Sequence, residues 1–205
     1  MTGRLAITLL LVAAAASAET NIVIQTEKGD IEAVLDEVKA PITVANFLRY
    51  LDDGRYNGGQ FHRTVRSRFD NQPQNPIKID VVQASVRRDA ASKAFPPIPL
   101  ERTSKTGLRH IDGALSMARG EKLDSATSDF FICIGPQPEL DYGGKRNPDG
   151  QGFAVFGRVI NGMDVVHKIQ DSPSGPTGPG ANAASAGNQR LIPPIAILAI
   201  RRRTP

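Results

Sequence analysis

Residues 21–35 read NIVIQTEKGDIEAVL and contain two runs of strand-forming residues on either side of a turn. The first run covers residues 21–26, the second covers residues 31–35, and Lys28-Gly29-Asp30 lies between them. Two short β-rich runs around a glycine turn are typical of a hairpin. The sequence therefore predicts a β-hairpin at this point of the chain.

Short strand candidates recur beyond this hairpin. They lie at residues 61–65, 77–86, 113–118, 129–134, 153–160 and 194–201. Polar or Gly- and Pro-rich loops are predicted at residues 67–76 and 173–188. No alternation of strand and helix runs along the chain, so a parallel sheet is not expected.

Two helices complete the pattern. Pro41 occupies a first-turn position, and Val44, Phe47, Leu48 and Leu51 then share one helical face. Residues 163–169 form a second, shorter helix. Many short strands with two helices predict a mainly β single domain, a barrel or sandwich with helical covers. A first and a last strand that paired side by side would close such a barrel.

The N-terminal segment has the three parts of a secretory signal peptide. Residues 1–4 are positively charged, residues 5–16 are apolar or small apart from Thr8, and Ala16-Ser17-Ala18 is a small-x-small cleavage signal. A membrane anchor is the alternative, but the run is shorter than the roughly 20 residues that span a bilayer. We therefore expect residues 1–18 to be removed, a mature domain of residues 19–205 without stable membrane insertion, and a periplasmic or secreted location.

Composition excludes several classes of protein. Hydrophobic residues make up 40% and charged residues 22% of the 205 residues, as in ordinary globular proteins. The net charge of +4 comes without a basic stripe interleaved with aromatics, so nucleic acid is not an expected partner. The terminal run Arg201-Arg202-Arg203 is either a solvated tail or an anchor for an acidic partner. Nothing in the sequence demands more than a monomer.

Cys133 is the only cysteine, which excludes an internal disulfide. It lies in the apolar run of residues 130–134, so a buried, inert thiol is expected rather than a nucleophile.

Several motifs in order resemble those of one enzyme family. They are Phe61-His62-Arg63, Gln83 at the end of a strand, GALSMA at residues 113–118, DSATSDFFI at residues 124–132, Leu140-Asp141, Val155-Phe156-Gly157 and GMDVV at residues 162–166. Over residues 21–201 the chain resembles the cyclophilin-type peptidyl-prolyl cis-trans isomerases, and their bacterial exported branch in particular. The resemblance implies a closed eight-stranded antiparallel barrel capped by two helices, with the site on one outer face. It also implies isomerase activity on proline-containing polypeptides without a cofactor or metal.

This reaction needs a fixed cation more than a nucleophile. The barrier to rotation of a peptide bond, about 18–20 kcal/mol, comes from amide resonance, and no bond need be broken. A cation that donates to the nitrogen of the twisted amide stabilises the transition state. Arginine stays charged and presents several donors in a rigid fork. By resemblance, Arg63 is the catalytic residue; on residue type alone it would be assigned to a surface ion pair.

The resemblance also assigns the substrate-binding residues. They are Gln83, Val81, Met117, Ala118, Asp129, Phe131, Leu140 and Phe153. Met117, Phe131, Leu140 and Phe153 would line the proline pocket, Gln83 would hold the substrate backbone, and Ala118 would lie on the path of the residue before proline. Phe130 and Phe131 are adjacent on a strand and must face opposite sides, and the family register selects Phe131 for the site. His62, His110 and His167 are expected to be structural.

Some positions depart from the family pattern. The stretch from Arg63 to Gln83 is longer than in compact members, and the loop at residues 67–76 absorbs the difference. The family Phe falls at Asp80 and its Met at Val81, with Val81 on the same side as Gln83 by alternation. Two other family residues, an Asn and a Gln, have become Arg119 and Asp129, which would either pair with each other or tune the residue accepted before proline. The Trp contacted by cyclosporin falls at Glu139, which predicts weak cyclosporin binding.

Two alternatives to a peptidyl-prolyl isomerase remain. One is a cyclophilin-like binding module or chaperone that grips proline-containing segments with little turnover, as the altered Asp80, Arg119 and Glu139 would allow. The other is a hydrolase, which is disfavoured because the sequence has neither a Gly-x-Ser-x-Gly elbow nor a His-Glu-x-x-His helix. The retained Arg63 favours the isomerase.

Overall fold

The computed structural model describes residues 19–175 and 186–203, so the predicted signal peptide and most of the predicted loop at residues 173–188 lie outside the described residues. The strands are β1 (Glu19–Thr26), β2 (Gly29–Asp36), β3 (Gln60–Val65), β4 (Val81–Ser85), β5 (Ala114–Met117), β6 (Phe130–Cys133), β7 (Ala154–Asn161), β8 (Ser174–Gly175) and β9 (Arg190–Arg202). The helices are α1 (Pro41–Asp52), α2 (Arg88–Ala91), α3 (Thr103–Thr106), α4 (Met163–Gln170) and the 3₁₀ turns η1 (Pro138–Leu140) and η2 (Ala186–Gln189).

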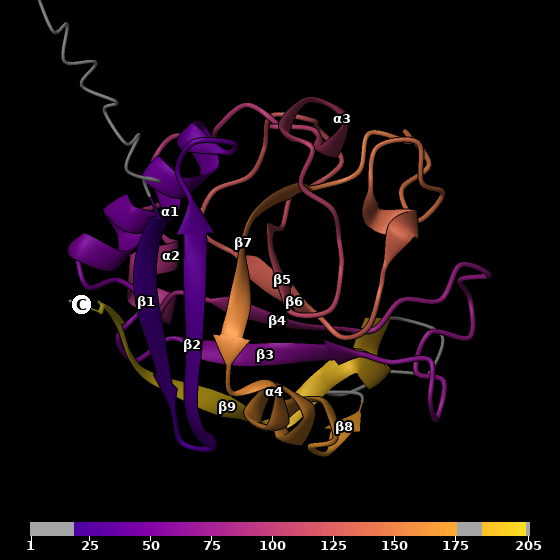
Figure 1. The fold of residues 1–205 in the computed structure, drawn as a ribbon. Helices are drawn as coiled ribbons and strands as arrows, with labels where there is room; N and C mark the ends of the chain where they lie inside the picture. The colour runs from indigo at the N-terminus through magenta and orange to yellow at the C-terminus, as the bar shows by residue number, and fades with distance from the viewer. Residues whose placement is uncertain (1–18, 176–185, 204–205) are drawn as a thin grey trace, which may run out of the picture.

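Eight antiparallel strands close into a barrel (Figure 1). Their order is β1-β2-β7-β5-β6-β4-β3-β9, and β9 pairs back with β1, for example at Ile24 and Ile200. The two-residue strand β8 adds only to the outer side of β9. The closed eight-stranded barrel implied by the resemblance is therefore confirmed, and closure leaves no free sheet edge in the ring.

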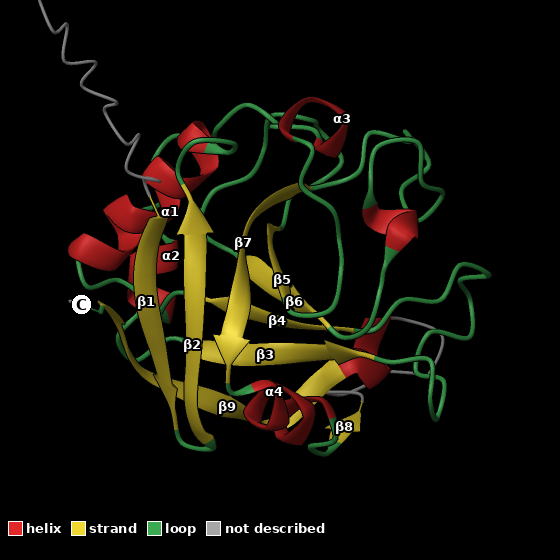
Figure 2. Ribbon diagram, viewed as in Figure 1, coloured by secondary structure: helices red, strands yellow, loops and turns green. Residues whose placement is uncertain are grey.

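The two predicted helices cover the barrel from different sides (Figure 2). Phe47 of α1 lies with its ring centroid 5.4 Å from that of Phe130 and 5.2 Å from that of Phe156, within one buried apolar core. Val166 and Ile169 of α4 are fully buried in the same core. Both helices therefore bury the faces that their apolar spacing predicts.

Alternation along the strands separates this core from the outer face that bears the site. On β4, Val82 and Ala84 belong to the barrel core, whereas Val81 belongs to a second, outer apolar cluster. On β6, Phe130 points into the core and Phe131 joins the outer cluster. The predicted orientations of Val81 and of the two phenylalanines are confirmed.

The predicted strand at residues 77–86 is too long, because β4 begins only at Val81. The Gln72 side chain bonds both backbone groups of Ile79, accepting from its N–H at 3.3 Å and donating to its C=O at 2.8 Å. The N–H of Asp80 donates to the side chain of Gln137 at 3.2 Å. Side chains therefore replace strand partners at Ile79 and at the N–H of Asp80, while the C=O of Asp80 still accepts from the N–H of Ile134 at 2.9 Å.

The C-terminal arginines are exposed, as a solvated segment would be, but Arg201 and Arg202 belong to β9 and not to a free tail. Arg202 ends β9 and donates to both carboxylate oxygens of Asp52, at 3.0 and 2.8 Å, and Arg203 pairs with Glu32. β9 itself begins at Arg190 rather than at the predicted residue 194, because Arg190 pairs with both β3 and β8. No helix in the described part of the chain is long and apolar enough to cross a membrane.

Candidate active site

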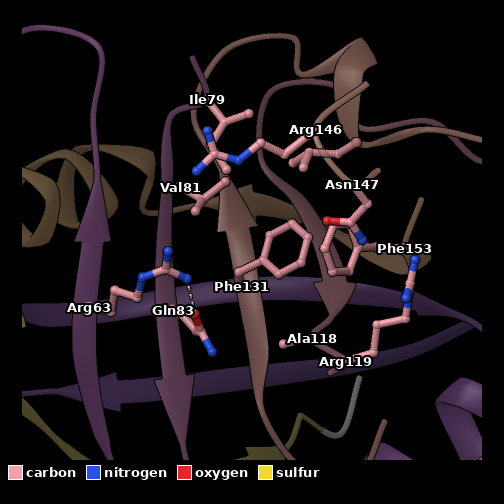
Figure 3. A pocket seen from close by; sticks show the side chains of 11 residues that line it. Arg63, Ile79, Val81, Gln83, Ala118, Arg119, Phe131, Arg146, Asn147 and Phe153 are labelled. Carbon is pink, nitrogen blue, oxygen red and sulfur yellow. Dashed lines mark hydrogen bonds between the residues drawn. The ribbon is translucent and has the colours of Figure 1, made fainter. Parts of the chain in front are cut away.

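A pocket of about 250 Å³ lies on the outer face of β3, β4 and β6, beneath two neighbouring loops (Figure 3). Its lining combines arginines, amides and apolar side chains. These residues are Arg63, Ile79, Val81, Gln83, Ala118, Arg119, Phe131, Leu140, Arg146, Asn147 and Phe153. None of residues 67–76 is among them, so the inserted loop does not plug the pocket.

Arg63 lies at one side of the pocket and is held by two glutamines. Its Nη1 donates to Oε1 of Gln83 at 2.9 Å, as Figure 3 shows. Its Nε and Nη2 both donate to Oε1 of Gln189, at 2.9 and 2.6 Å. An arginine carries five N–H donors. These three bonds therefore leave two donors without a partner among the described residues.

Arg63 is partly buried in a positively charged environment. Burial lowers the pKa of its guanidinium to about 10, and the nearby Arg146 and Arg190 contribute to that shift. The group therefore remains charged at neutral pH. A partly buried charge held by fixed dipoles interacts more strongly with a reacting amide than a fully solvated charge does.

The apolar part of the pocket is built around Phe131. The Phe153 ring meets it edge-on, with centroids 5.3 Å apart and planes at 87°. Val81 and Leu140 belong to the same buried cluster, and Ala118 packs against it. The structure thus brings together six of the predicted substrate-binding residues, the sixth being Gln83.

A buried hydrogen-bonded chain lies behind Phe131. His110 stacks on the Phe131 ring with centroids 5.9 Å apart. Its Nδ1 lies 2.8 Å from Oδ1 of Asp141, and its Nε2 lies 2.9 Å from Oγ of Ser116. Burial lowers the pKa of His110, so the neutral ring donates to Asp141 and accepts from Ser116. Ser116 has no exposed surface, so this Ser-His-Asp chain is structural and offers no accessible nucleophile.

Two predicted substrate contacts are not in the pocket. Met117 is 1% exposed and points into the barrel core, because it neighbours the outward-facing Ala118 and successive strand residues face opposite sides. The prediction that it lines the pocket is wrong. Asp129 is not among the lining residues; burial raises the pKa of its carboxyl, and hydrogen bonding from Ser128 and Gln83 opposes that shift.

Arg119 does not pair with Asp129. Its Nη2 donates to both carboxylate oxygens of Asp149, at 2.9 and 2.8 Å, and its Nε donates to the C=O of Gly152 at 2.9 Å. The guanidinium also lies 5.4 Å from the centroid of the Phe153 ring. Arg119 is therefore a neutralised part of the pocket wall.

Residues missed by sequence reasoning close the pocket. Ile79 precedes β4, and Arg146 and Asn147 lie between η1 and β7. Gln189, at the end of η2, was also missed; it lies outside the lining but accepts two hydrogen bonds from Arg63. One signal was available for Arg146 and Asn147. Leu140 and Phe153 were both assigned to the pocket, so the turn-rich segment between them must start and end there. No comparable pattern points to Gln189.

The remaining predicted features fall outside the pocket. Cys133 is fully buried, and burial raises the pKa of its thiol well above the usual value, in agreement with an inert side chain. No group of three or more His, Cys, Asp or Glu side chains in the described residues could hold a metal ion.

The sequence places this pocket in a known family. Residues 21–201 match the family model described as cyclophilin type peptidyl-prolyl cis-trans isomerase/CLD. The chain belongs to this family. Among curated relatives, it is 36% identical to peptidyl-prolyl cis-trans isomerase A of Dickeya dadantii, over 88% of this chain and 87% of the relative. It is 33% identical to peptidyl-prolyl cis-trans isomerase B of Escherichia coli, over 75% of this chain and 85% of the relative.

Solved cyclophilins share the fold. A cyclophilin type peptidyl-prolyl cis-trans isomerase from Cryptosporidium parvum matches with a TM-score of 0.69 at 20% identity, covering 91% of this chain and 99% of that one. The same protein was also crystallised in the presence of the dipeptide Ala-Pro. Together, the family match and the curated relatives make this chain a cyclophilin-type isomerase of Xaa–Pro peptide bonds.

Proposed function

We propose that this cyclophilin-type isomerase accelerates Xaa–Pro rotation in exported polypeptides while they fold, with Arg63 as the catalytic residue. The observation that carries the proposal is the geometry of Arg63 beside the apolar pocket. Two glutamine oxygens fix its guanidinium, while two of its N–H donors remain open among the described residues. Proline isomerisation is slow enough to limit folding, so an exported catalyst has a clear use.

The residues of the pocket have separate roles in the isomerisation. The proline ring enters the space between Phe131, Leu140 and Phe153, the apolar part of the pocket. The carbonyl before the proline then turns while the ring stays fixed. An open N–H of Arg63 donates to the proline nitrogen as that nitrogen regains its lone pair. This bond exists only in the twisted state, so it lowers the barrier rather than merely tightening substrate binding.

The proposed location depends on the N-terminal segment. Its charged start, apolar run and small-x-small site support export to the periplasm or the medium. The test is to express the full chain in a Gram-negative host, fractionate the cells and sequence the N-terminus of the recovered protein. A periplasmic product that begins at Glu19 supports export. A cytoplasmic product that begins at Met1 contradicts it.

The catalytic role of Arg63 is tested by an isomerisation assay on a short Xaa–Pro peptide. We expect Arg63→Ala to lower kcat/KM by about 100-fold or more, because one transition-state donor is worth about 10²–10³ in rate. Exposed Arg158 on β7 provides the matched control, and Arg158→Ala should match the parent. Equal rates for the parent and Arg63→Ala would rule out the assigned role.

The second candidate is a binding module with little turnover. The observation in its favour is that three of the five Arg63 donors are already committed within the protein. The same peptides separate the two functions. Binding without acceleration over the uncatalysed rate would support the module, whereas acceleration that depends on Arg63 supports the enzyme.

A further inference from the structure

Arg146 joins two loops at the end of the pocket away from Ala118. Figure 3 shows its guanidinium beside Ile79 and Val81, across the Phe131 ring from Ala118. Its Nη1 donates to Oε1 of Gln72 at 2.9 Å and to the C=O of Ile77. The segment after η1 is thereby fastened to the inserted segment before β4, and the half-buried guanidinium is held in one place.

One edge of this guanidinium is open. Both bonds use Nη1, and neither Nε nor Nη2 has a partner among the described residues. The Nε–Nη2 edge is the face of arginine that binds a carboxylate through two parallel hydrogen bonds. The corresponding edge of Arg63 is occupied by Gln189. Arg146 thus offers two adjacent N–H donors, on Nε and Nη2, whereas those of Arg63 are already bonded.

The positive charge around the Arg146 guanidinium is not balanced by nearby carboxylates. Arg119, on the opposite side of the pocket, is neutralised by Asp149. In the described residues neither Arg63 nor Arg146 has a carboxylate within ion-pair distance, and Arg190 adds a third positive charge close to Arg63. The acidic Asp129 lies outside the lining. Excess positive charge in a partly desolvated cleft favours an anionic ligand.

We propose that the Nε–Nη2 edge of Arg146 binds a carboxylate of the substrate, an Asp or Glu side chain in one of the two residues that follow the proline. The direction follows from the two ends of the pocket. The family resemblance assigns Ala118 to the path of the residue before proline, so a substrate bound in that direction leaves the pocket beside Arg146. The inference rests on the proposed function, because it assumes that the pocket holds an Xaa–Pro segment.

The test compares isomerisation of matched peptides by exchange NMR, which reads rotation without a coupled protease. Each peptide contains Ala-Pro followed by Glu or Gln, at the first or second position after the proline, with an amidated C-terminus. We expect kcat/KM for Glu to exceed that for Gln by about fivefold or more at one position at low salt, because a carboxylate held by two donors is a strong contact. The ratio should fall as salt is raised.

Variants assign the preference to Arg146. Arg146→Gln should bring the Glu-to-Gln ratio to about one, whatever its effect on kcat/KM for the Gln peptide, and the exposed control Arg158→Gln should retain the parent ratio. A parent ratio near one, or a ratio unchanged in Arg146→Gln, overturns the proposal. If Arg146→Gln does not fold, the ratio in the parent and its salt dependence decide alone.

Two further peptide measurements make the assignment to a side-chain carboxylate specific. A Gln peptide with a free C-terminal carboxylate replaces the side-chain anion by a terminal one, and a preference confined to this peptide overturns the side-chain assignment. If no peptide is isomerised, the proposed function fails on its own. The Kd values of the Glu and Gln peptides then decide the inference. Tighter binding of the Glu peptide by the parent, but not by Arg146→Gln, supports it.

Discussion

The side-chain oxygen of Gln189 accepts two hydrogen bonds from Arg63, although 126 residues separate the two in sequence. The amide nitrogen of Gln189 donates to the C=O of Asn71 at 3.0 Å, and the Asn71 side chain donates to the C=O of Thr64 at 2.8 Å. The orientation of the acceptor is thus tied back to β3, the strand that carries Arg63. Contacts between distant segments of the fold therefore hold the guanidinium in place.

This relationship predicts a rate defect for Gln189→Leu. Without the acceptor, Nε and Nη2 lose their fixed direction, so the open donors no longer lie where the twisted amide forms. We expect kcat to fall about tenfold, with little change in KM, because pre-organised donors act mainly in the transition state. Steady-state kinetics on a neutral Xaa–Pro peptide measures both constants.

The conservative variant Gln189→Glu is the control for this prediction. It keeps an oxygen acceptor toward Arg63 but loses the N–H that donates to Asn71, so its kcat should lie between those of Gln189→Leu and the parent. A merely structural role would instead make both variants unstable without a selective change in kcat. Equal kcat in Gln189→Leu and the parent would contradict the positioning role.

Local patterns account for what could be predicted from the sequence. The alternation of β4 and β6 correctly separates Val81 from Val82 and Phe131 from Phe130. The same rule would have excluded Met117, since Ala118 next to it was already assigned to the pocket. At Met117 the family motif and the strand period disagree, and the structure follows the strand period.

Contacts between distant loops could not be predicted in this way. Gln189 and Arg146 lie on segments without hydrophobic periodicity, and their partners Arg63 and Gln72 are far away in sequence. Arg119 shows the same limit. Its partner is Asp149, and only the path of the loop before β7 brings that carboxylate within reach.

The Arg119–Asp149 pair predicts a stability effect. Arg119 is 1% exposed in its side chain, so removing Asp149 leaves a buried guanidinium without its counter-charge. We expect Asp149→Asn to lower the free energy of unfolding by about 1–3 kcal/mol, below the range for fully buried pairs because Asp149 is partly exposed. Urea unfolding measures the change. Asp164→Asn removes the exposed partner of Lys168 and should have no measurable effect; an equally small change in Asp149→Asn would contradict the prediction.

His62 predicts acid sensitivity. Burial lowers the pKa of its imidazole to about 4, and Arg63 and Arg190 add repulsion. Because the pKa in the unfolded chain is near 6.5, the unfolded state takes up the proton first as pH falls. This residue's contribution to stability is therefore complete above about pH 6.5 and is lost between about pH 6.5 and pH 4. The loss is on the order of 3 kcal/mol.

The pH dependence can be assigned by substitution. His62→Gln should flatten the fall in urea midpoint between pH 6.5 and pH 4, whereas the exposed His167→Gln should leave the parent curve unchanged. An identical slope in the parent and His62→Gln would show that other groups control acid unfolding.

Glu139 leads to a prediction about inhibition. By family resemblance, the Trp contacted by cyclosporin falls at this position, and here the Glu139 carboxylate accepts from the N–H of Lys145 at 2.8 Å. A charged side chain at an apolar contact must be desolvated without a partner on the ligand. We therefore expect weak binding of cyclosporin by the parent protein.

Glu139→Trp should tighten binding by about tenfold or more, since a buried indole supplies a large apolar contact. Isothermal titration measures both Kd values, with Glu139→Gln as the control that removes only the charge. Parent binding as tight as that of Glu139→Trp would show that the altered position does not govern the inhibitor.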